Sequence, residues 1–99
     1  MWYCIYAKDS PNSLKKRLVN RPKHIKRLEQ LQDEGRLLIA GPFPNIDSID
    51  PGANGFSGSL IIAEFNSLNE AKKWAKNDPF FHCRVYEKVE VKPFKKTLP

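Results

Sequence analysis

The chain has 99 residues and a formal net charge of +6, and 40% of its residues are hydrophobic. This length predicts a single domain over residues 1–99, and the apolar content excludes an intrinsically disordered chain. No apolar run approaches the ~20 residues that a membrane-spanning helix requires, so we expect no membrane partner.

A basic charge is common in nucleic-acid-binding proteins, but its distribution here argues against a binding surface. Lys and Arg are absent from residues 37–71, and acidic residues interrupt them in the two flanking stretches. Several lie on helix faces that should be solvated, namely Lys23, Lys26, Lys72 and Lys76. We therefore expect a solvated surface and no nucleic-acid partner.

The two cysteines, Cys4 and Cys83, form neither a CxxC motif nor a zinc-ligand spacing. Both fall in strand-like runs, which favours reduced core thiols. The first residues, MWYCIYAKD, contain no basic leader of a signal peptide, so we expect a cytoplasmic protein. Gly52, Gly55 and Gly58 match no nucleotide-binding pattern, and we expect neither a metal nor a cofactor.

The N-terminal residues predict a strand and a short helical segment. Residues 2–7 (WYCIYA) are rich in aromatic and β-forming residues, and both the odd and the even positions carry apolar side chains. This pattern is typical of a central strand that is covered on both faces. A loop at residues 9–12 and a short helical turn at residues 13–19 follow.

The main helix is predicted to begin at Arg21. Asn20 is a favourable N-cap, and Pro22 suits a first turn, where its missing N–H would have no partner. This start places His24 in the first turn of the helix. Gly35 supplies the left-handed conformation that ends it. Apolar residues follow helical spacing between these limits: Ile25, Leu28 and Leu31.

A short strand and a long connection follow this helix. Residues 36–40 form an apolar run that Gly41-Pro42 closes. The polar connection over residues 43–58 is longer than ordinary hairpin loops, and it is either a flap over a site or a tolerated surface loop. Residues 59–65 (SLIIAEF) predict a second strand that is buried on both faces.

The last part of the chain predicts a second helix and a final strand. Ser67 and Glu70 form a capping box at the start of this helix. Pro79 disfavours helix in the preceding residue, so the helix should end at Asn77-Asp78. Its apolar stripe consists of Leu68, Ala71, Trp74 and Ala75. Residues 82–91 predict the last strand, with Val85, Val89 and Val91 on one face.

The order of elements is βαββαβ, which predicts a ferredoxin-like α+β sandwich. In this fold a four-stranded antiparallel sheet carries two helices on one face. The strands at residues 2–7 and 59–65 are apolar on both faces, and no third helix is available to cover the second face. The simplest cover is a second copy of the chain, so we expect a symmetric homodimer packed through its sheet faces.

This topology brings His24 and Asp78 to one end of the sheet, together with Ala40-Gly41-Pro42. A carboxylate bonded to one ring nitrogen fixes the tautomer of a histidine and leaves the other nitrogen for acid/base chemistry. The positive end of the helix disfavours the imidazolium form of His24, whereas Asp78 favours it. In the alternative interpretation, His24 is a half-buried helix residue and Asp78 only ends a helix.

Three further residues are weaker candidates for this site. Arg21 could bind an anionic substrate beside the helix N-terminus, although a surface position is the simpler interpretation. Ser59 lacks the glycine elbow of a nucleophile, so we interpret it as a strand residue that borders the site. His82 could reach the same end of the sheet, but we expect it to be exposed.

Five segments resemble the YCII-related family over essentially the whole chain: SLKKRLVNRPKHIKRL, DEGRLLIAGPFP, GFSGSLIIAEF, AKKWAKNDPF and VKPFKK. Members are similar to dimeric α+β barrel proteins, in which two ferredoxin-like chains pack their sheets together. The family's histidine–aspartate couple, proposed as its active site, carries over onto His24 and Asp78. Its cleft-lining turn carries over onto Ala40-Gly41-Pro42. One relative removes chloride from a chlorinated aromatic diol.

Three functions follow from these observations. The first is a cofactor-free enzyme of the lyase, isomerase or dehydrochlorinase type, with His24 as acid/base and Asp78 to orient it. The second is a non-catalytic dimer that binds a small-molecule ligand. The third is RNA binding, because the RRM domain shares this topology. An RRM displays stacking rings on its third strand, however, and residues 59–63 (SLIIA) offer none.

Overall fold

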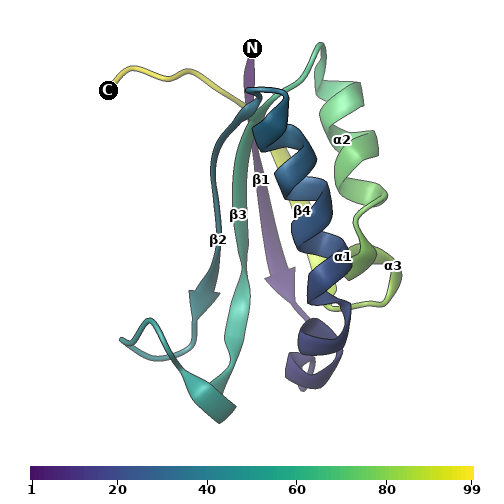
Figure 1. Cartoon of the computed structure of the whole chain (residues 1–99), viewed down its shortest axis with the longest axis vertical. Coiled ribbons are helices and arrows are strands. Elements are labelled where there is room, and N and C mark those ends of the chain that lie inside the picture. The colour runs from purple at the N-terminus through teal and green to yellow at the C-terminus, as the bar shows by residue number, and fades with distance from the viewer.

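The computed structural model describes residues 1–99 as one antiparallel sheet with the strand order β2-β3-β1-β4 (Figure 1). Its strands are β1 (Trp2–Asp9), β2 (Leu37–Pro44), β3 (Phe56–Glu64) and β4 (Tyr86–Phe94). The helices are α1 (Leu14–Asp33), α2 (Leu68–Lys76) and α3 (Pro79–His82), with a 3₁₀ turn, η1 (Gly52–Asn54), between β2 and β3. The expected βαββαβ sandwich is confirmed.

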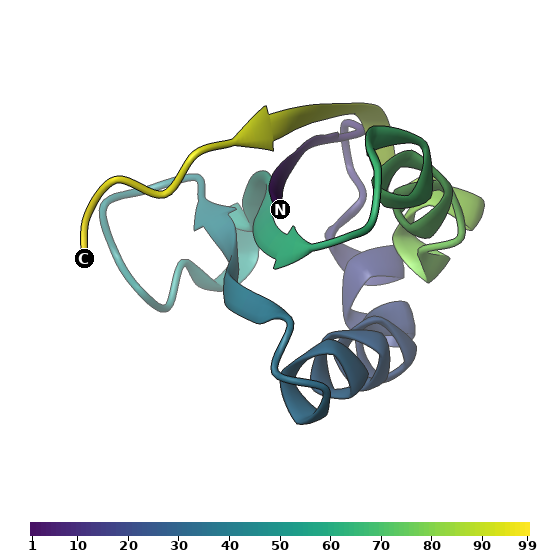
Figure 2. The same ribbon diagram turned by 90° about the horizontal axis from the view of Figure 1, so that it is seen from above.

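The helices cover one face of the sheet, and the main core lies beneath them (Figures 1 and 2). Alternate residues of β1 are buried on this face, as the twofold periodicity of a strand requires. They pack with one stripe of α1 and with the small residues of α2. The main cluster consists of Tyr3, Ile5, Leu28, Leu31, Ile61, Ala63, Phe65, Ala71 and Ala75.

The opposite, open face of the sheet is apolar along three strands and charged along the fourth. By register it carries Trp2, Cys4, Tyr6, Ile39, Phe43, Leu60 and Ile62. The rings of Tyr6 and Phe43 lie 5.7 Å apart, and Tyr6 is 50% exposed. Lys88, Glu90 and Lys92 of β4 continue this face as a row of alternating charges. The expected apolar second face is present, and no helix of the chain covers it (Figure 2).

The predicted start of the main helix is wrong, because α1 begins at Leu14 and Pro22 lies inside it. Asn20 is not an N-cap; its side-chain amide donates to the Lys16 carbonyl within the helix. The buried residues of α1 lie on both sides of the proline, at Arg17 and His24, and their packing holds the helix together. His24 is therefore in the middle of α1, and the expected field of a helix N-terminus does not act on it.

The end of α1 follows the prediction, whereas β2 is longer than predicted. Gly35 has a φ of 72°, and the amides of Gly35 and Arg36 donate to the carbonyls of Gln32 and Leu31 in a Schellman motif. Gly41-Pro42 does not close the strand, which continues to Pro44. Because β2 is an edge strand, it tolerates a proline without losing a hydrogen bond within the sheet.

Two other boundaries differ from the prediction. The connection between β2 and β3 is shorter than residues 43–58, and it swings to the side of the sheet opposite the helices (Figures 1 and 2). The last strand begins at Tyr86 and not at residue 82, because Pro79 starts the short helix α3. Cys83 accordingly follows a helix and does not lie in a strand. Both cysteines are free and half-buried.

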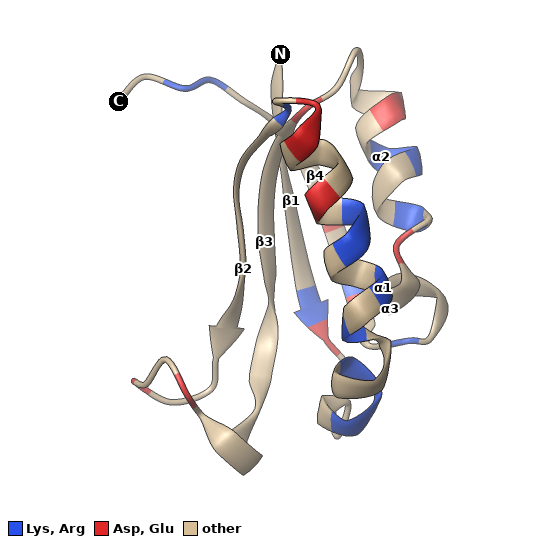
Figure 3. Cartoon of the chain, viewed as in Figure 1, with Lys and Arg blue, Asp and Glu red and all other residues tan.

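Lys and Arg positions are spread along helices α1 and α2, with acidic positions among them (Figure 3). The four lysines expected on solvated faces are all exposed: Lys23, Lys26, Lys72 and Lys76. Their positions agree with a solvated surface. No helix is long and apolar enough to cross a membrane.

Close packing between β1 and β3 at Gly58 generates a prediction. A Cβ atom at this position would overlap the carbonyl oxygen of Ala7, whereas one at Gly41 would meet nothing. We expect Gly58→Ala to lower the free energy of unfolding by about 2 kcal/mol, as overpacking typically does. Gly41→Ala, the control, should change it by about 1 kcal/mol or less. Urea denaturation measures both; equal effects would contradict the packing account.

Candidate functional site

A hydrogen bond between α1 and the α2–α3 junction joins His24 to Asp78, residues 54 positions apart. The Nδ1 atom of His24 lies 2.9 Å from both carboxylate oxygens of Asp78. Both residues are buried, with 6% of His24 and 1% of Asp78 exposed. The expected convergence of this imidazole and this carboxylate is observed, although His24 reaches it from the middle of its helix.

The sequence around Asp78 fixes its carboxylate in place. Asp78 is the N-cap of α3, and its Oδ1 accepts a hydrogen bond from the Phe80 amide at 2.9 Å. Pro79 occupies the first turn, where its missing N–H costs no hydrogen bond. Asn77-Asp78-Pro79 thus ends one helix and starts the next, and the N-cap bond of the second helix orients the Asp78 carboxylate.

Arg27, one turn beyond His24 on α1, adds a positive charge beside this pair. Its Nη1 lies 3.8 Å from Oδ2 of Asp78, and its Nη2 donates to the Trp74 carbonyl. Burial lowers the pKa of Arg27, and the negative charge of Asp78 opposes this effect. Because its guanidinium also stacks on the Trp74 ring at 4.2 Å, Arg27 is held close to Asp78.

Aromatic side chains surround the His24 ring. Phe80 stacks on it, with the ring centroids 4.1 Å apart, and Tyr86 meets both rings edge-on. Burial raises the pKa of the Tyr86 phenol above its usual range, and the charge of Asp78 adds to this effect. The nearby Ser59 hydroxyl lowers the pKa of Tyr86 and so opposes this shift. Its geometry does not meet the criteria for a hydrogen bond, and the buried phenol oxygen therefore has no partner. The Nε2 atom of His24 has no hydrogen-bond partner in the protein.

A cavity of about 120 Å³ lies between α1 and the edge of the sheet. His24 lines it, and so do all the other expected binding residues: Arg21, Ala40, Gly41, Pro42 and Ser59. The remaining lining residues are Arg17, Ile25, Leu28, Ile61 and Phe80. Neither His82, which is exposed at the end of α3, nor the connection between β2 and β3 lines this cavity.

The sequence analysis missed one charged residue of the cavity, Arg17. This arginine is 5% exposed, and a bidentate ion pair joins it to Asp9 at the end of β1. A helix beginning at Leu14 would have placed Arg17 on the same buried stripe as His24 and Leu28. A charged residue within an apolar stripe is the signal that could have revealed it.

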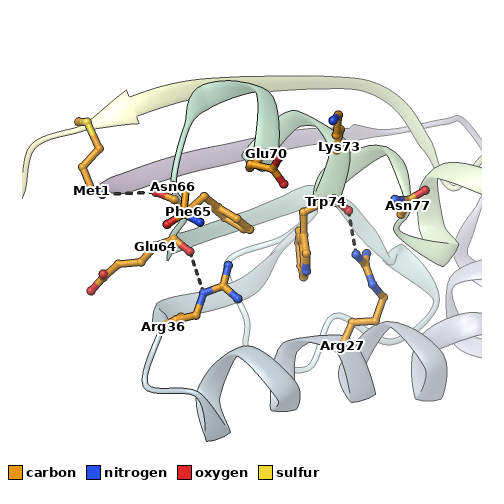
Figure 4. Close-up of a pocket in the computed structure, with 10 residues that line it drawn as sticks. All are labelled: Met1, Arg27, Arg36, Glu64, Phe65, Asn66, Glu70, Lys73, Trp74 and Asn77. Carbon is orange, nitrogen blue, oxygen red and sulfur yellow. Dashed lines mark hydrogen bonds between the residues drawn. The ribbon is translucent and has the colours of Figure 1, made fainter.

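A larger hollow of about 830 Å³ lies elsewhere, between α2 and the C-terminal half of α1, and His24 does not line it (Figure 4). Arg27 stacks on Trp74 and Arg36 stacks on Phe65 along its walls. These contacts are between residues of the wall itself, which gives the residues a structural role. No group of three or more His, Cys, Asp and Glu side chains could hold a metal ion.

Comparisons with known proteins agree with this arrangement. The family model of the YCII-related domain matches residues 1–95. The chain belongs to this family. Within it, the chain is 60% identical to Protein YciI of Escherichia coli O6:H1 over 98 residues, which are 99% of this chain and all of that protein. It is 54% identical to an uncharacterised protein of Haemophilus influenzae over 98 residues, again 99% of this chain and all of that protein.

A solved structure extends the family comparison to a protein with a bound ligand. The fold is similar to that of 5-chloro-2-hydroxyhydroquinone dehydrochlorinase (TftG) from Burkholderia phenoliruptrix AC1100, in complex with 2,5-dihydroxybenzoquinone. The TM-score is 0.83 and the sequence identity 29%, over 96% of this chain and 94% of that chain. The YCII-related chain described here therefore shares its fold with an enzyme.

The bond to Asp78 predicts the tautomer of His24. A carboxylate only accepts hydrogen bonds, so the neutral ring must carry its proton on Nδ1 and leave a lone pair on Nε2. We expect ¹⁵N chemical shifts of an Nδ1–H imidazole for His24, and a shift toward the Nε2–H form in Asp78→Ala. Exposed His82 serves as the internal reference, because its shifts should be the same in both proteins. An Nε2–H signal for His24 in the wild type would contradict this geometry.

Proposed function

We propose that this protein is an acid/base enzyme that acts on a small molecule in the cavity beside His24. One observation carries the proposal: both oxygens of buried Asp78 hold Nδ1 of His24, while Nε2 has no protein partner. A ring held in this way accepts a proton on Nε2, and the adjacent carboxylate stabilises the imidazolium that forms. Elimination, isomerisation and enolisation all require such a proton transfer.

The size of the cavity and the structural neighbour narrow the substrate class. A cavity of ~150 Å³ holds one benzene ring, and the cavity here measures about 120 Å³. TftG is a dehydrochlorinase, and its structure contains a single oxygenated ring. Both observations favour a substrate with one small oxygenated ring, and they favour lyase or isomerase chemistry that the side chains of the protein perform without a cofactor.

A second candidate function uses the same cavity without catalysis. A non-catalytic protein would bind a small anionic ligand between the cavity wall and Arg21, which is exposed at its mouth. In that case the His24–Asp78 pair would only position the ligand. The two functions differ in one measurable respect, since only the enzyme moves a proton.

Proton exchange distinguishes the two functions. We expect the wild type in D₂O to exchange an acidic C–H of at least one small cyclic ketone or hydroxyquinol, or to convert it, as followed by NMR. His24→Ala should slow this reaction about 10²- to 10⁴-fold, the usual contribution of a general acid/base group. The matched control, His82→Ala, should react like the wild type because His82 is exposed and outside the cavity.

The same set of small cyclic compounds also provides the results that would contradict the proposal. If ligands raise the melting temperature of the wild type but none is exchanged or converted, the non-catalytic function is correct. If His24→Ala retains the wild-type exchange rate, His24 is not the proton-transferring group. Circular dichroism of each variant separates a loss of folding from a loss of chemistry.

We also propose that the protein is a homodimer whose subunits pack through the open faces of their sheets. The apolar residues of β1, β2 and β3 on this face form a contiguous surface, which monomeric proteins rarely leave in water. A domain of this size buries little more than ~60% of its unfolded surface, so pairing would add a substantial core. In a dimer with twofold symmetry, the open face of one subunit would cover the same face of the other.

A charge at the centre of this face tests the dimer. Tyr6 lies between Leu60 and Glu90 in the sheet register, and Tyr6→Lys would place an ammonium group in the interface. We expect the wild type to elute as a dimer in size-exclusion chromatography with light scattering, and Tyr6→Lys as a monomer. Val19→Lys changes an apolar residue that is 73% exposed on α1, and it should leave the dimer intact. A monomeric wild type at all concentrations would contradict the proposal.

A further inference from the structure

Arg17 and Asp9 form an ion pair inside the protein, and Arg17 lines the same cavity as His24. The Nε and Nη2 atoms of Arg17 donate to the two carboxylate oxygens of Asp9 at 2.8 and 2.9 Å. Nη2 also donates to the Gly58 carbonyl at 3.3 Å and to the Ser59 hydroxyl at 2.9 Å. These bonds to β1 and β3 fix the plane of the guanidinium.

One nitrogen of this guanidinium remains available. Nη1 of Arg17 makes no hydrogen bond to the protein and is not among the buried unpaired polar atoms, so it keeps contact with accessible space. Arg17 lines the cavity together with Ser59. Because the Ser59 oxygen accepts a bond from Arg17, its own O–H is left to donate, to a ligand or to the neighbouring Tyr86 phenol. The wall of the cavity at Arg17 and Ser59 therefore offers hydrogen-bond donors, one of which is permanently charged.

Structural stability explains this arrangement poorly. An ion pair removed from water gains little net stability, because the lost hydration offsets most of the attraction between the charges. The Arg17 guanidinium is also packed over the Phe56 and Phe80 rings, at 5.4 and 4.9 Å. The pair instead supplies a charged donor at a fixed position in the wall of a cavity, which is what an anion-binding site requires.

Arg17 and His24, which both line the cavity, lie on the same face of α1. Arg17 and His24 are seven residues apart, which is about two turns or ~10 Å along a helix, and both are buried on its inner face. The Phe80 ring contacts both side chains, with His24 stacked on it and the Arg17 guanidinium above it. A small molecule in the cavity thus lies between a proton acceptor, Nε2 of His24, and a charged donor, Nη1 of Arg17.

We propose that Arg17, oriented by Asp9 and assisted by Ser59, binds the oxygen of the substrate that becomes negatively charged during proton transfer. This inference rests on the acid/base function of His24 and adds the substrate class, a small enolisable carbonyl compound or its enol. Arg17 is then a catalytic residue because it contacts the reacting oxygen. Asp9 is a positioning residue because it acts through Arg17.

The proton transfer balances without a co-reactant. Nε2 of His24 takes a proton from the carbon next to the carbonyl, and the C–H electrons form a C=C bond. The carbonyl π electrons move onto oxygen, and the resulting enolate accepts hydrogen bonds from Arg17 and Ser59. In an isomerisation of a β,γ-unsaturated carbonyl compound, the imidazolium returns its proton to the γ carbon of the dienolate. In an elimination, the carbonyl re-forms, the C=C electrons form a bond between the α and β carbons, and the leaving group departs from the β carbon with its bonding electrons; the imidazolium gives its proton to water.

A stable enolate tests this assignment by binding alone. Cyclopentane-1,3-dione is ionised as its enolate at pH 8, and cyclopentanone is an uncharged analogue of similar shape. We expect the wild type to bind the enolate more tightly than the ketone in NMR or calorimetric titrations. The double variant Asp9→Asn with Arg17→Gln should weaken enolate binding about tenfold or more, as loss of a charged hydrogen bond does, and leave the ketone affinity unchanged.

The double variant avoids an unpaired buried charge, which a single change at Arg17 would leave on Asp9. If it fails to fold, Arg17→Lys keeps the positive charge but loses the bidentate geometry, and it should also weaken enolate binding selectively. Lys26→Gln removes one positive charge from the exposed side of the same helix and should bind both compounds like the wild type.

The outcomes separate this inference from the proposed function. Equal affinity of the wild type for enolate and ketone, or unchanged enolate binding in the Arg17 variants, overturns the role of Arg17. Neither result bears on proton exchange by His24. His24→Ala should retain enolate binding within about threefold, because the charged donor that holds the oxygen is still present. A loss of exchange in His24→Ala with retained enolate binding supports both assignments.

Discussion

The hydrogen bond between His24 and the buried carboxylate of Asp78 is the constraint on which the rest of the site depends. It joins the first and second halves of the chain through two groups that water would otherwise solvate. Burying an unpaired carboxylate costs several kcal/mol, so Asp78 requires every partner that surrounds it. The N-cap geometry of α3, the imidazole and nearby Arg27 together supply them. Orientation of His24 and folding of this region therefore have the same physical cause.

The site is held by two buried charged pairs and not by one. Asp78 is bonded to His24 and Asp9 to Arg17, and both His24 and Arg17 line the cavity. In both pairs a carboxylate from outside α1 fixes a side chain of that helix, and Phe80 packs against both of the oriented groups. A chain of 99 residues has a small core, and burying four charged or polar side chains in it reduces the stability that apolar residues would provide. What it gains is a cavity whose acceptor and donor are already in place before a ligand binds.

The topology could be predicted from the sequence, because it follows from the order of elements. The same order brings the end of α2 to α1, but His24 contacts Asp78 from the middle of α1 and not from the predicted first turn. Hydrophobic periodicity located each strand and each long helix, and the βαββαβ order then determined which ends meet. The boundaries were less predictable. Pro22 looked like a helix start, since propensity alone cannot show that buried residues on both sides would keep α1 continuous through it. That error hid Arg17, whose place on the inner face of α1 is evident only once the helix begins at Leu14. The sequence analysis predicted that a helix ends at Asp78 and missed that another begins there, although Asp-Pro is also a good helix start.

The alternation of β3 separates the two surfaces that the proposed function uses. Ser59 and Ile61 point to the helix side and line the cavity, whereas Leu60 and Ile62 point to the open face. Because successive side chains of a strand point to opposite sides, one short segment contributes to the cavity on one face and to the apolar open face on the other. A shift of one residue in its pairing would exchange the two sets and abolish both surfaces. The close contact of Gly58 with the β1 backbone opposes such a shift, since only a residue without a side chain fits there. The register of β3 against β1 therefore determines that Ser59 lies in the cavity, where Arg17 can reach it.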